Sequence, residues 1–123
     1  MTDRRRVLVI DDSLDTAQTM TFLLRDAGHF VDFVMTGNAA LEMAKRTRPE
    51  VIFLDIGLPD YDGCKLARDI KQSPGLANTR IVALTGRNCD DETRALDAGC
   101  ALFLSKPLDP RTLEKVLLQA ASE

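Results

Sequence analysis

The sequence contains no long hydrophobic run, and this limits where the protein can work. Its apolar stretches have the length of single strands, far short of the ~18 residues that a membrane-spanning helix needs. The apolar stretch that follows Arg4, Arg5 and Arg6 covers only residues 7–10, which is too short for the core of a signal peptide. We therefore expect a cytoplasmic protein that does not bind membranes.

Cysteine and histidine are scarce. The three cysteines, Cys64, Cys89 and Cys100, show no C-x-x-C spacing and are odd in number, so we expect free thiols in a reducing compartment. His29 is the only histidine and directly precedes an expected strand, far from the candidate site described below. We interpret it as a surface residue, neither a metal ligand nor a phosphate donor.

The chain also lacks a strong excess of charge. Its formal net charge of -3 argues against a surface that binds nucleic acid. The only basic run, Arg4 to Arg6, is interpreted as a solvated segment that leads into the first strand. With 123 residues, 45% of them hydrophobic, the chain is long enough to bury a full core. Because no linker, repeat or low-complexity segment interrupts it, we expect one domain over residues 1–123.

What the chain does have is a regular alternation of two patterns. Short runs rich in Val, Ile, Leu and Phe predict buried strands at residues 7–10, 30–35, 51–54, 80–84 and 101–104. Helical periodicity predicts helices at residues 13–27, 38–47, 63–72, 90–98 and 110–121. This alternation predicts a doubly wound α/β fold, with helices on both faces of a five-stranded parallel sheet. The flavodoxin-like strand order 2-1-3-4-5 is the expected one, with ligands at the carboxyl ends of strands 1 and 3.

Acidic residues stand at those two strand ends. Asp11 and Asp12 follow the first strand, and Asp55 follows the third. If the strands are neighbours, three carboxylates converge and their mutual repulsion needs a cation to offset it. Magnesium takes oxygen ligands of this kind, and the backbone carbonyl of Gly57 is a candidate for one more. The alternative is that Asp11 or Asp12 merely caps the helix that begins near Ser13.

Two further polar residues follow the fourth and fifth strands. Thr85 comes directly after residues 81–84, and Lys106 comes shortly after residues 102–104. In the expected strand order both point toward Asp55. A hydroxyl and a mobile ammonium beside a metal-binding carboxylate form a site for an incoming anion such as a phosphoryl group.

Taken together, these motifs resemble the receiver domain of two-component response regulators, a CheY-like family. The resemblance covers essentially the whole chain. It rests on the segments Val-Leu-Val-Ile-Asp-Asp-Ser at 7–13, Leu-Asp-Ile-Gly-Leu-Pro-Asp-Tyr-Asp-Gly at 54–63, Ala-Leu-Thr-Gly at 83–86, Ala-Gly at 98–99 and Lys-Pro at 106–107. The stretches around Asp55 and Thr85 look most like receivers of hybrid sensor histidine kinases.

The resemblance implies a role for each residue at the site. Asp55 matches the phosphoacceptor, and Asp11 and Asp12 match the acidic pair that holds Mg²⁺ together with Asp55 and the Gly57 carbonyl. Lys106 matches the lysine that pairs with the phosphoryl group. Thr85 matches the hydroxyl that moves toward that group, and Phe103 matches the aromatic residue whose rotamer reports the movement. The Lys106–Pro107 bond matches a cis peptide of the family.

The resemblance also implies partners and an output. The phosphoryl donor would be a sensor histidine kinase or a histidine phosphotransfer protein. The output would act on an unknown downstream protein or attached domain. The expected output face comprises the helix at 90–98, the strand at 101–104 and the helix at 110–121. Such a domain catalyses only its own phosphorylation and dephosphorylation, and is otherwise not an enzyme.

Two other functions are alternatives to this one. The first is an adaptor of the same fold that acts through protein contacts without phosphorylation. The second is a flavodoxin-like binder of a flavin or nucleotide, which the acidic segment at 11–15 would repel.

Two side chains are left with open roles. Phe22 is a lone apolar residue on a polar helix face, either without function or a docking contact. Arg87 either reaches the phosphoryl group or lies in solvent.

Overall fold

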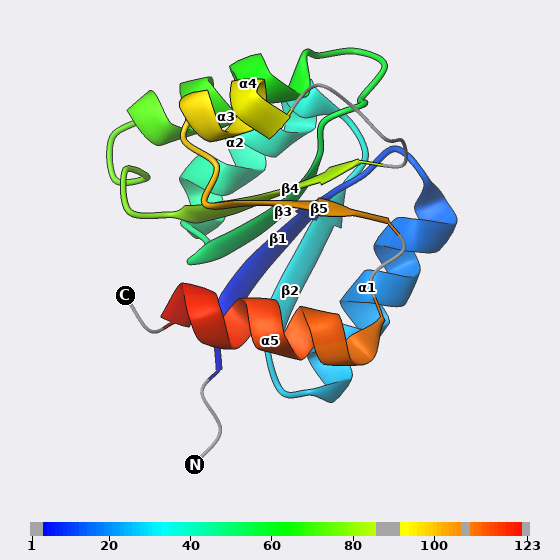
Figure 1. Cartoon of the computed structure of the whole chain (residues 1–123). Helices are drawn as coiled ribbons and strands as arrows, with labels where there is room; N and C mark the ends of the chain where they lie inside the picture. The colour runs from blue at the N-terminus through cyan, green and yellow to red at the C-terminus, as the bar shows by residue number, and fades with distance from the viewer. Residues whose placement is uncertain (1–3, 86–91, 107–108, 122–123) are drawn as a thin grey trace.

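A five-stranded parallel sheet forms the centre of the molecule (Figure 1). The computed structural model describes residues 4–85, 92–106 and 109–121. The strands run in the order β2-β1-β3-β4-β5, as predicted. Their bounds are β1 Arg6–Ile10, β2 Phe30–Val34, β3 Val51–Asp55, β4 Arg80–Thr85 and β5 Leu102–Ser105. The helices that connect and follow them are α1 Leu14–Asp26, α2 Gly37–Thr47, α3 Gly63–Gln72, α4 Glu92–Asp97 and α5 Pro110–Ala121.

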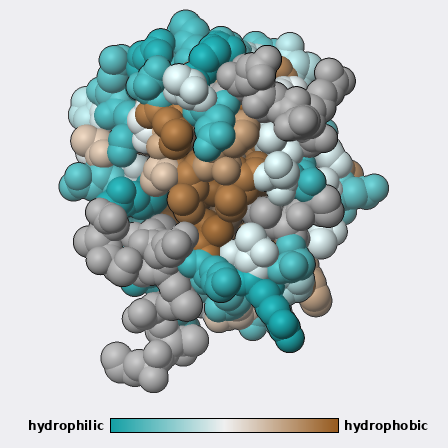
Figure 2. Space-filling view, viewed as in Figure 1, coloured by the Kyte–Doolittle hydropathy of each residue, from teal (hydrophilic) through white to brown (hydrophobic). Residues whose placement is uncertain are grey.

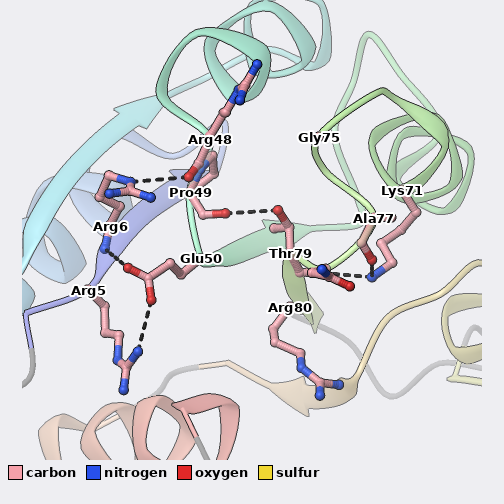
Figure 3. A pocket seen from close by; sticks show the side chains of 11 residues that line it. Arg5, Arg6, Arg48, Pro49, Glu50, Lys71, Gly75, Ala77, Thr79 and Arg80 are labelled. Carbon is pink, nitrogen blue, oxygen red and sulfur yellow. Dashed lines mark hydrogen bonds and ion pairs between the residues drawn. The ribbon is translucent and has the colours of Figure 1, made fainter. Parts of the chain in front are cut away.

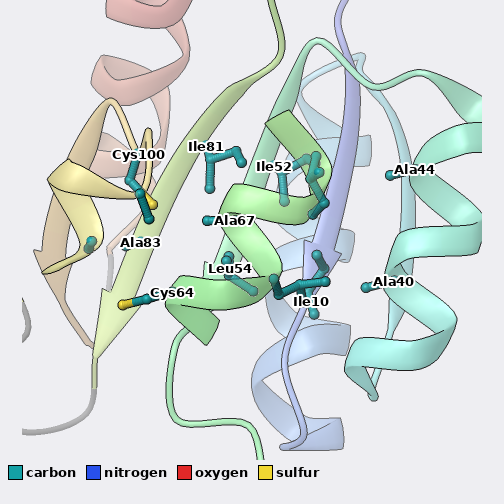
Figure 4. Packing of buried hydrophobic residues seen from close by; sticks show 14 of the residues in the cluster. Ile10, Ala40, Ala44, Ile52, Leu54, Cys64, Ala67, Ile81, Ala83 and Cys100 are labelled. Carbon is teal, nitrogen blue, oxygen red and sulfur yellow. The ribbon is translucent and has the colours of Figure 1, made fainter. Parts of the chain in front are cut away.

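The sheet separates two hydrophobic cores. Successive strand residues point to opposite faces, so Val7 and Val9 pack with α1 and α5 while Leu8 and Ile10 pack with α2, α3 and α4. Figure 1 shows these two helix layers on either side of the strands. In the second core small residues of the helices, among them Ala40, Ala44 and Ala67, face the larger side chains of the sheet (Figure 4). This close packing fixes the strand ends that carry the candidate site.

Three strands, β3, β4 and β5, end one residue later than the apolar pattern predicts. Asp55 belongs to β3 and pairs with Leu84, and Thr85 belongs to β4 and pairs with Ser105. Hydrophobicity was the only signal for where a strand ends, but the backbone ladder continues through a polar residue because its hydrogen bonds do not depend on the side chain. Asp55 and Thr85 are therefore held by the sheet itself, whereas Asp11, Asp12 and Lys106 come directly after strands.

The first helix begins with a serine cap. Ser13 has extended backbone angles, and its hydroxyl accepts a hydrogen bond from the Thr16 N–H at 3.4 Å. The alternative that Asp11 or Asp12 caps this helix is therefore wrong. At the other end Gly28 adopts a φ of 102°, a conformation that glycine accepts readily, and ends the helical path.

Several expectations fall at the margins of the described residues. Of the helix predicted at 90–98, residues 92–97 are helical. Arg87 and Cys89 lie outside the described residues, and so does Pro107, so the predictions for these two side chains and for the Lys106–Pro107 bond concern residues that the structure does not describe. Cys64 and Cys100 are buried, and burial, followed by the neighbouring Cys64, raises the pKa of Cys100 to about 12. None of the helices in the described ranges has the length and apolar character that a bilayer crossing needs.

The start of α3 depends on a glycine. A methyl group at Gly63 would collide with the backbone of Ile56, whose carbonyl oxygen would lie only 2.7 Å from it. Gly63→Ala should therefore lower the free energy of unfolding by about 1–3 kcal/mol, because backbone must move to make room. Gly57→Ala is the matched control, since its methyl group would meet only the Asp55 Oδ1 at an ordinary 3.4 Å. Urea unfolding that gives equal stabilities for the two variants would contradict this account.

Candidate functional site: an acidic cluster with a lysine

The three aspartates predicted to converge do lie together. Asp11 and Asp12 follow β1, and Asp55 ends the neighbouring β3. One carboxylate oxygen from each of them lies within 4.8 Å of the others. The cluster lies at the carboxyl ends of the strands, because parallel strands all end on the same side of the sheet.

Asp11 and Asp55 are buried, with 1% and 6% of their surface exposed. Each is held by a backbone donor. The Ser13 N–H donates to Asp11 Oδ1 at 2.9 Å, and the Gly57 N–H donates to Asp55 Oδ1 at 2.8 Å. These bonds satisfy one oxygen of each carboxylate and leave the other oxygen directed toward a positive partner.

Lys106 is that partner. Its Nζ lies 2.6 Å from Asp11 Oδ2 and 3.1 Å from Asp55 Oδ2, so one ammonium joins two carboxylates. Burial alone would lower the pKa of Lys106, but the hydrogen bonds and charges of Asp11 and Asp55 outweigh burial and raise the pKa. The lysine therefore stays charged in spite of its largely buried position.

Asp12 is the exposed member of the cluster. Its pKa is raised, first by partial burial and then by the neighbouring carboxylates of Asp55 and Asp11. Burial and the two neighbouring carboxylates thus act in the same direction, and both disfavour the charged form of Asp12. A divalent cation would reverse that effect by favouring the charged form.

Thr85 and Phe103, the other two residues predicted for the site, lie on β4 and β5. Thr85 is buried at the end of β4, and its carbonyl accepts a hydrogen bond from the Lys106 N–H at 2.8 Å. Phe103 is half-buried on β5 and packs against the core shared by α2, α3 and α4. Figure 2 shows hydrophobic side chains gathered between α4 and α5, over β5. Exposed Leu96 and half-buried Leu102, Phe103 and Leu104 belong to these elements.

Residues 7–118 match the family model of the response regulator receiver domain. The chain belongs to this family.

Known proteins similar to this receiver domain agree with the assignment. A 14.6 kDa protein of Leptolyngbya boryana is 31% identical over 114 residues, which cover 92% of this chain and 87% of that protein. Response regulator PleD of Caulobacter vibrioides is 35% identical over 107 residues, which are 85% of this chain but only 23% of PleD. A chemotaxis response regulator of Vibrio cholerae superposes with a TM-score of 0.89 at 28% identity, covering 96% of this chain and 99% of that one.

The donor set of this receiver domain suits a small hard cation. Members of the family bind Mg²⁺ at an acidic pocket, and here three carboxylates offer oxygens at mutually short range. Asp11, Asp12 and Asp55 are the side chains that would hold the ion. For Gly57 the structure records the N–H bond to Asp55, so its carbonyl as a ligand stays a prediction.

The loop after Asp55 contains anchors that the sequence reasoning missed. The Asp60 carboxylate accepts hydrogen bonds from the Gly37 and Asn38 N–H groups at the start of α2, at 3.0–3.3 Å. The bond from Gly37 is the main cause of the lowered pKa of Asp60. On the other side the Tyr61 hydroxyl donates to Asp69 of α3. An acidic residue within the first turn of a helix can be recognised in a sequence, because it interacts favourably with the helix N-terminus. Asp60 could not be recognised in this way, because it lies 23 residues after Gly37, the first residue of α2.

Lys106→Met tests the central ion pair. The variant should lose about 1–3 kcal/mol of unfolding free energy at neutral pH, because two buried carboxylates lose their charged partner. Since the pKa of Lys106 is raised in the folded state, its contribution is complete below the ordinary value of 10.5 and is lost as the pH rises through the folded value. The gap between wild type and variant should therefore narrow only above about pH 10.5. Lys65→Met, which removes an exposed lysine, is the control. A gap that already closes at pH 8 would contradict the pairing.

Asp12→Asn tests the excess of negative charge. Without metal the variant should be slightly more stable than wild type, by less than about 1 kcal/mol because water screens this exposed side chain. Its melting temperature should rise far less on addition of Mg²⁺ than that of wild type, because one oxygen donor is lost. Asp32→Asn, an exposed acid on β2, should retain the full response to Mg²⁺. An equal response in both variants would argue against Asp12 as a ligand.

Proposed function

We propose that Asp55 is the phosphoacceptor of this receiver domain and that it takes a phosphoryl group from a phosphohistidine donor in a Mg²⁺-dependent reaction. The observation that carries the proposal is the position of Asp55, which shares a cluster with two other carboxylates and has the Lys106 ammonium 3.1 Å away. The donor would be a sensor histidine kinase or a histidine phosphotransfer protein, the partner classes of receiver domains.

The chemistry needs a nucleophile, charge compensation and a held geometry. A carboxylate oxygen of Asp55 forms the new P–O bond while the P–N bond of the donor breaks, and its electron pair returns to the imidazole, which takes up a proton. Bound Mg²⁺ would supply charge stabilisation for the phosphoryl oxygens. The Gly57 N–H orients Asp55, and Lys106, already between Asp11 and Asp55, neutralises charge on the transferred group.

The same charge change supports a role as a switch. Phosphorylation adds negative charge beside Lys106 and within reach of the strand that ends in Thr85. If the Lys106 ammonium turned toward the phosphoryl group, its ion pair with Asp11 would break. A hydrogen bond from the Thr85 hydroxyl to the phosphoryl group would pull the end of β4 toward Asp55. The apolar surface between α4 and α5, over β5 (Figure 2), is the expected contact for a downstream partner, and Phe103 belongs to that strand. Exposed Phe22 on α1 stays a candidate contact for the donor.

The protein would act as a cytoplasmic signalling component and turn over no metabolite. The competing function, an adaptor that needs no phosphate, would not require an acidic cluster whose members repel one another. The cost of holding Asp11, Asp12 and Asp55 within 4.8 Å is understandable if the cluster binds a cation for chemistry at Asp55.

Treatment with acetyl phosphate followed by intact-mass measurement tests the proposal. Wild type should gain the mass of one phosphoryl group in the presence of Mg²⁺ and none with a chelator. Asp55→Asn should gain none under either condition, whereas Asp97→Asn, which removes an exposed aspartate of α4, should behave as wild type. A folded wild-type protein that gains no mass with Mg²⁺ would favour the adaptor, and an adduct retained by Asp55→Asn would move the acceptor elsewhere.

A further inference from the structure

The residues that would hold Mg²⁺ come from two parts of the chain. Asp11 and Asp12 follow β1, whereas Asp55 is the last residue of β3. Hydrogen bonds between β1 and β3 set the spacing of these strand ends. Gly57 belongs to residues 56–62, the β3–α3 segment, and lies beyond the last paired residue of β3. The strand ladder therefore does not set the position of the Gly57 backbone.

Two contacts restrain the β3–α3 segment close to Gly57. The Ile56 N–H donates to the Leu84 carbonyl at 3.1 Å, and Leu58 is buried in the core shared with α2 and α3. Apolar packing has no preferred direction, so Leu58 fixes the depth of the segment better than the orientation of its peptide groups. Gly57 is exposed and has no side chain to pack. A directional contact after Leu58 would complete the restraint.

Asp60 makes that directional contact. Its two carboxylate oxygens accept hydrogen bonds from the Gly37 N–H at 3.0 and 3.1 Å, and one of them also accepts from the Asn38 N–H at 3.3 Å. Gly37 and Asn38 are the first two residues of α2, and N–H groups at a helix start have no partner within the helix. The negative charge of Asp60 also interacts favourably with the positive end of α2.

The start of α2 is a fixed point from which to hold the segment. Ala40 and Ala44 of α2 are fully buried against the sheet (Figure 4). At the end of β2, shortly before α2 begins, the Val34 carbonyl accepts a hydrogen bond from the Asp11 N–H at 3.1 Å. The part of the fold to which Asp60 is bonded is thus also bonded to Asp11. Asp60 therefore joins the β3–α3 segment to the part of the fold that carries the aspartates of β1.

Tyr61 adds a second contact with the same helix start. A methyl group at Gly37 would lie 2.3 Å from the Tyr61 Cβ, so the backbone of α2 and this side chain are in close contact. The Tyr61 hydroxyl donates to Asp69 of α3. The adjacent residues Asp60 and Tyr61 therefore attach the β3–α3 segment to both helices.

We propose that Asp60 is a positioning residue for Mg²⁺ binding, because its bonds to α2 hold the β3–α3 segment with the Gly57 backbone beside the aspartate cluster. The inference rests on the proposed function, in which Mg²⁺ is the ion and the Gly57 carbonyl a predicted ligand. The Gly57 N–H already bonds Asp55 Oδ1 at 2.8 Å. Within the described ranges the cluster consists of Asp11, Asp12 and Asp55, so Asp60 acts on the ion through the backbone and not as a ligand.

Calorimetric titration of the metal-free protein with Mg²⁺ tests the proposal. Asp60→Ala should raise the Kd for Mg²⁺ about tenfold, as expected when a group that orients a metal ligand is removed. Asp60→Asn keeps one acceptor oxygen and should give an intermediate Kd. Thr36→Ala is the matched control, because it removes the hydroxyl that caps the same helix, 3.2 Å from the Ala39 nitrogen, and leaves the β3–α3 segment untouched. It should bind Mg²⁺ as wild type does.

The amide proton shift of Gly57 in the metal-free protein, measured by NMR, gives a readout that needs no ion. It reports the hydrogen bond to Asp55, so it should change in Asp60→Ala and stay unchanged in Thr36→Ala. Urea unfolding establishes that each variant is folded, and Asp60→Asn decides if Asp60→Ala is not.

Three results would overturn the role of Asp60 alone. They are Mg²⁺ binding by Asp60→Ala as tight as that of wild type, equal weakening by Thr36→Ala, and an unchanged Gly57 amide shift in an Asp60→Ala variant that binds Mg²⁺ weakly. Equal weakening by Thr36→Ala would mean that fraying of α2 is the cause. A wild-type protein that binds no Mg²⁺ would instead overturn both this inference and the metal requirement of the proposed function.

Discussion

One ammonium group between two buried carboxylates organises the active edge of this domain. Lys106 follows β5, Asp11 follows β1, and Asp55 is the last residue of β3. The ion pairs therefore connect three strands, of which β5 is not a neighbour of β1 or β3 in the sheet. Without a cation in this position the buried acids would repel one another at close range. Lys106 offsets this repulsion in the structure, and a metal ion bound to the same carboxylates would offset it as well.

The sheet makes this arrangement possible because its strands are all parallel. Every strand delivers its last residue to the same edge, and the ladder keeps Asp55 and Thr85 in register with their neighbours. The opposite edge collects the residues that begin the strands, among them Arg6 and Arg80. As a result the domain carries an acidic cluster at the carboxyl ends of its strands and a hollow with a mainly basic lining at the opposite ends (Figure 3), with a hydrophobic core on each face of the sheet.

The fold and the acidic cluster could be predicted from the sequence because both depend on local patterns. Apolar runs give the strands, and the aspartates directly follow them. Strand ends at Asp55 and Thr85 were misjudged by one residue, since hydrophobicity does not report backbone pairing. The bond of Asp60 to α2 joins segments distant in the chain, so no local pattern could reveal it.

The first residue of α2 fits against Tyr61 so closely that Gly37 has no space for a side chain. Tyr61 in turn is bonded to Asp69, and its neighbour Asp60 grips the same helix start. The segment after Asp55 is thus held by contacts to two helices, α2 and α3. A shift of this segment would strain its bonds to both helices, so α2 and α3 are coupled to the carboxyl ends of the strands.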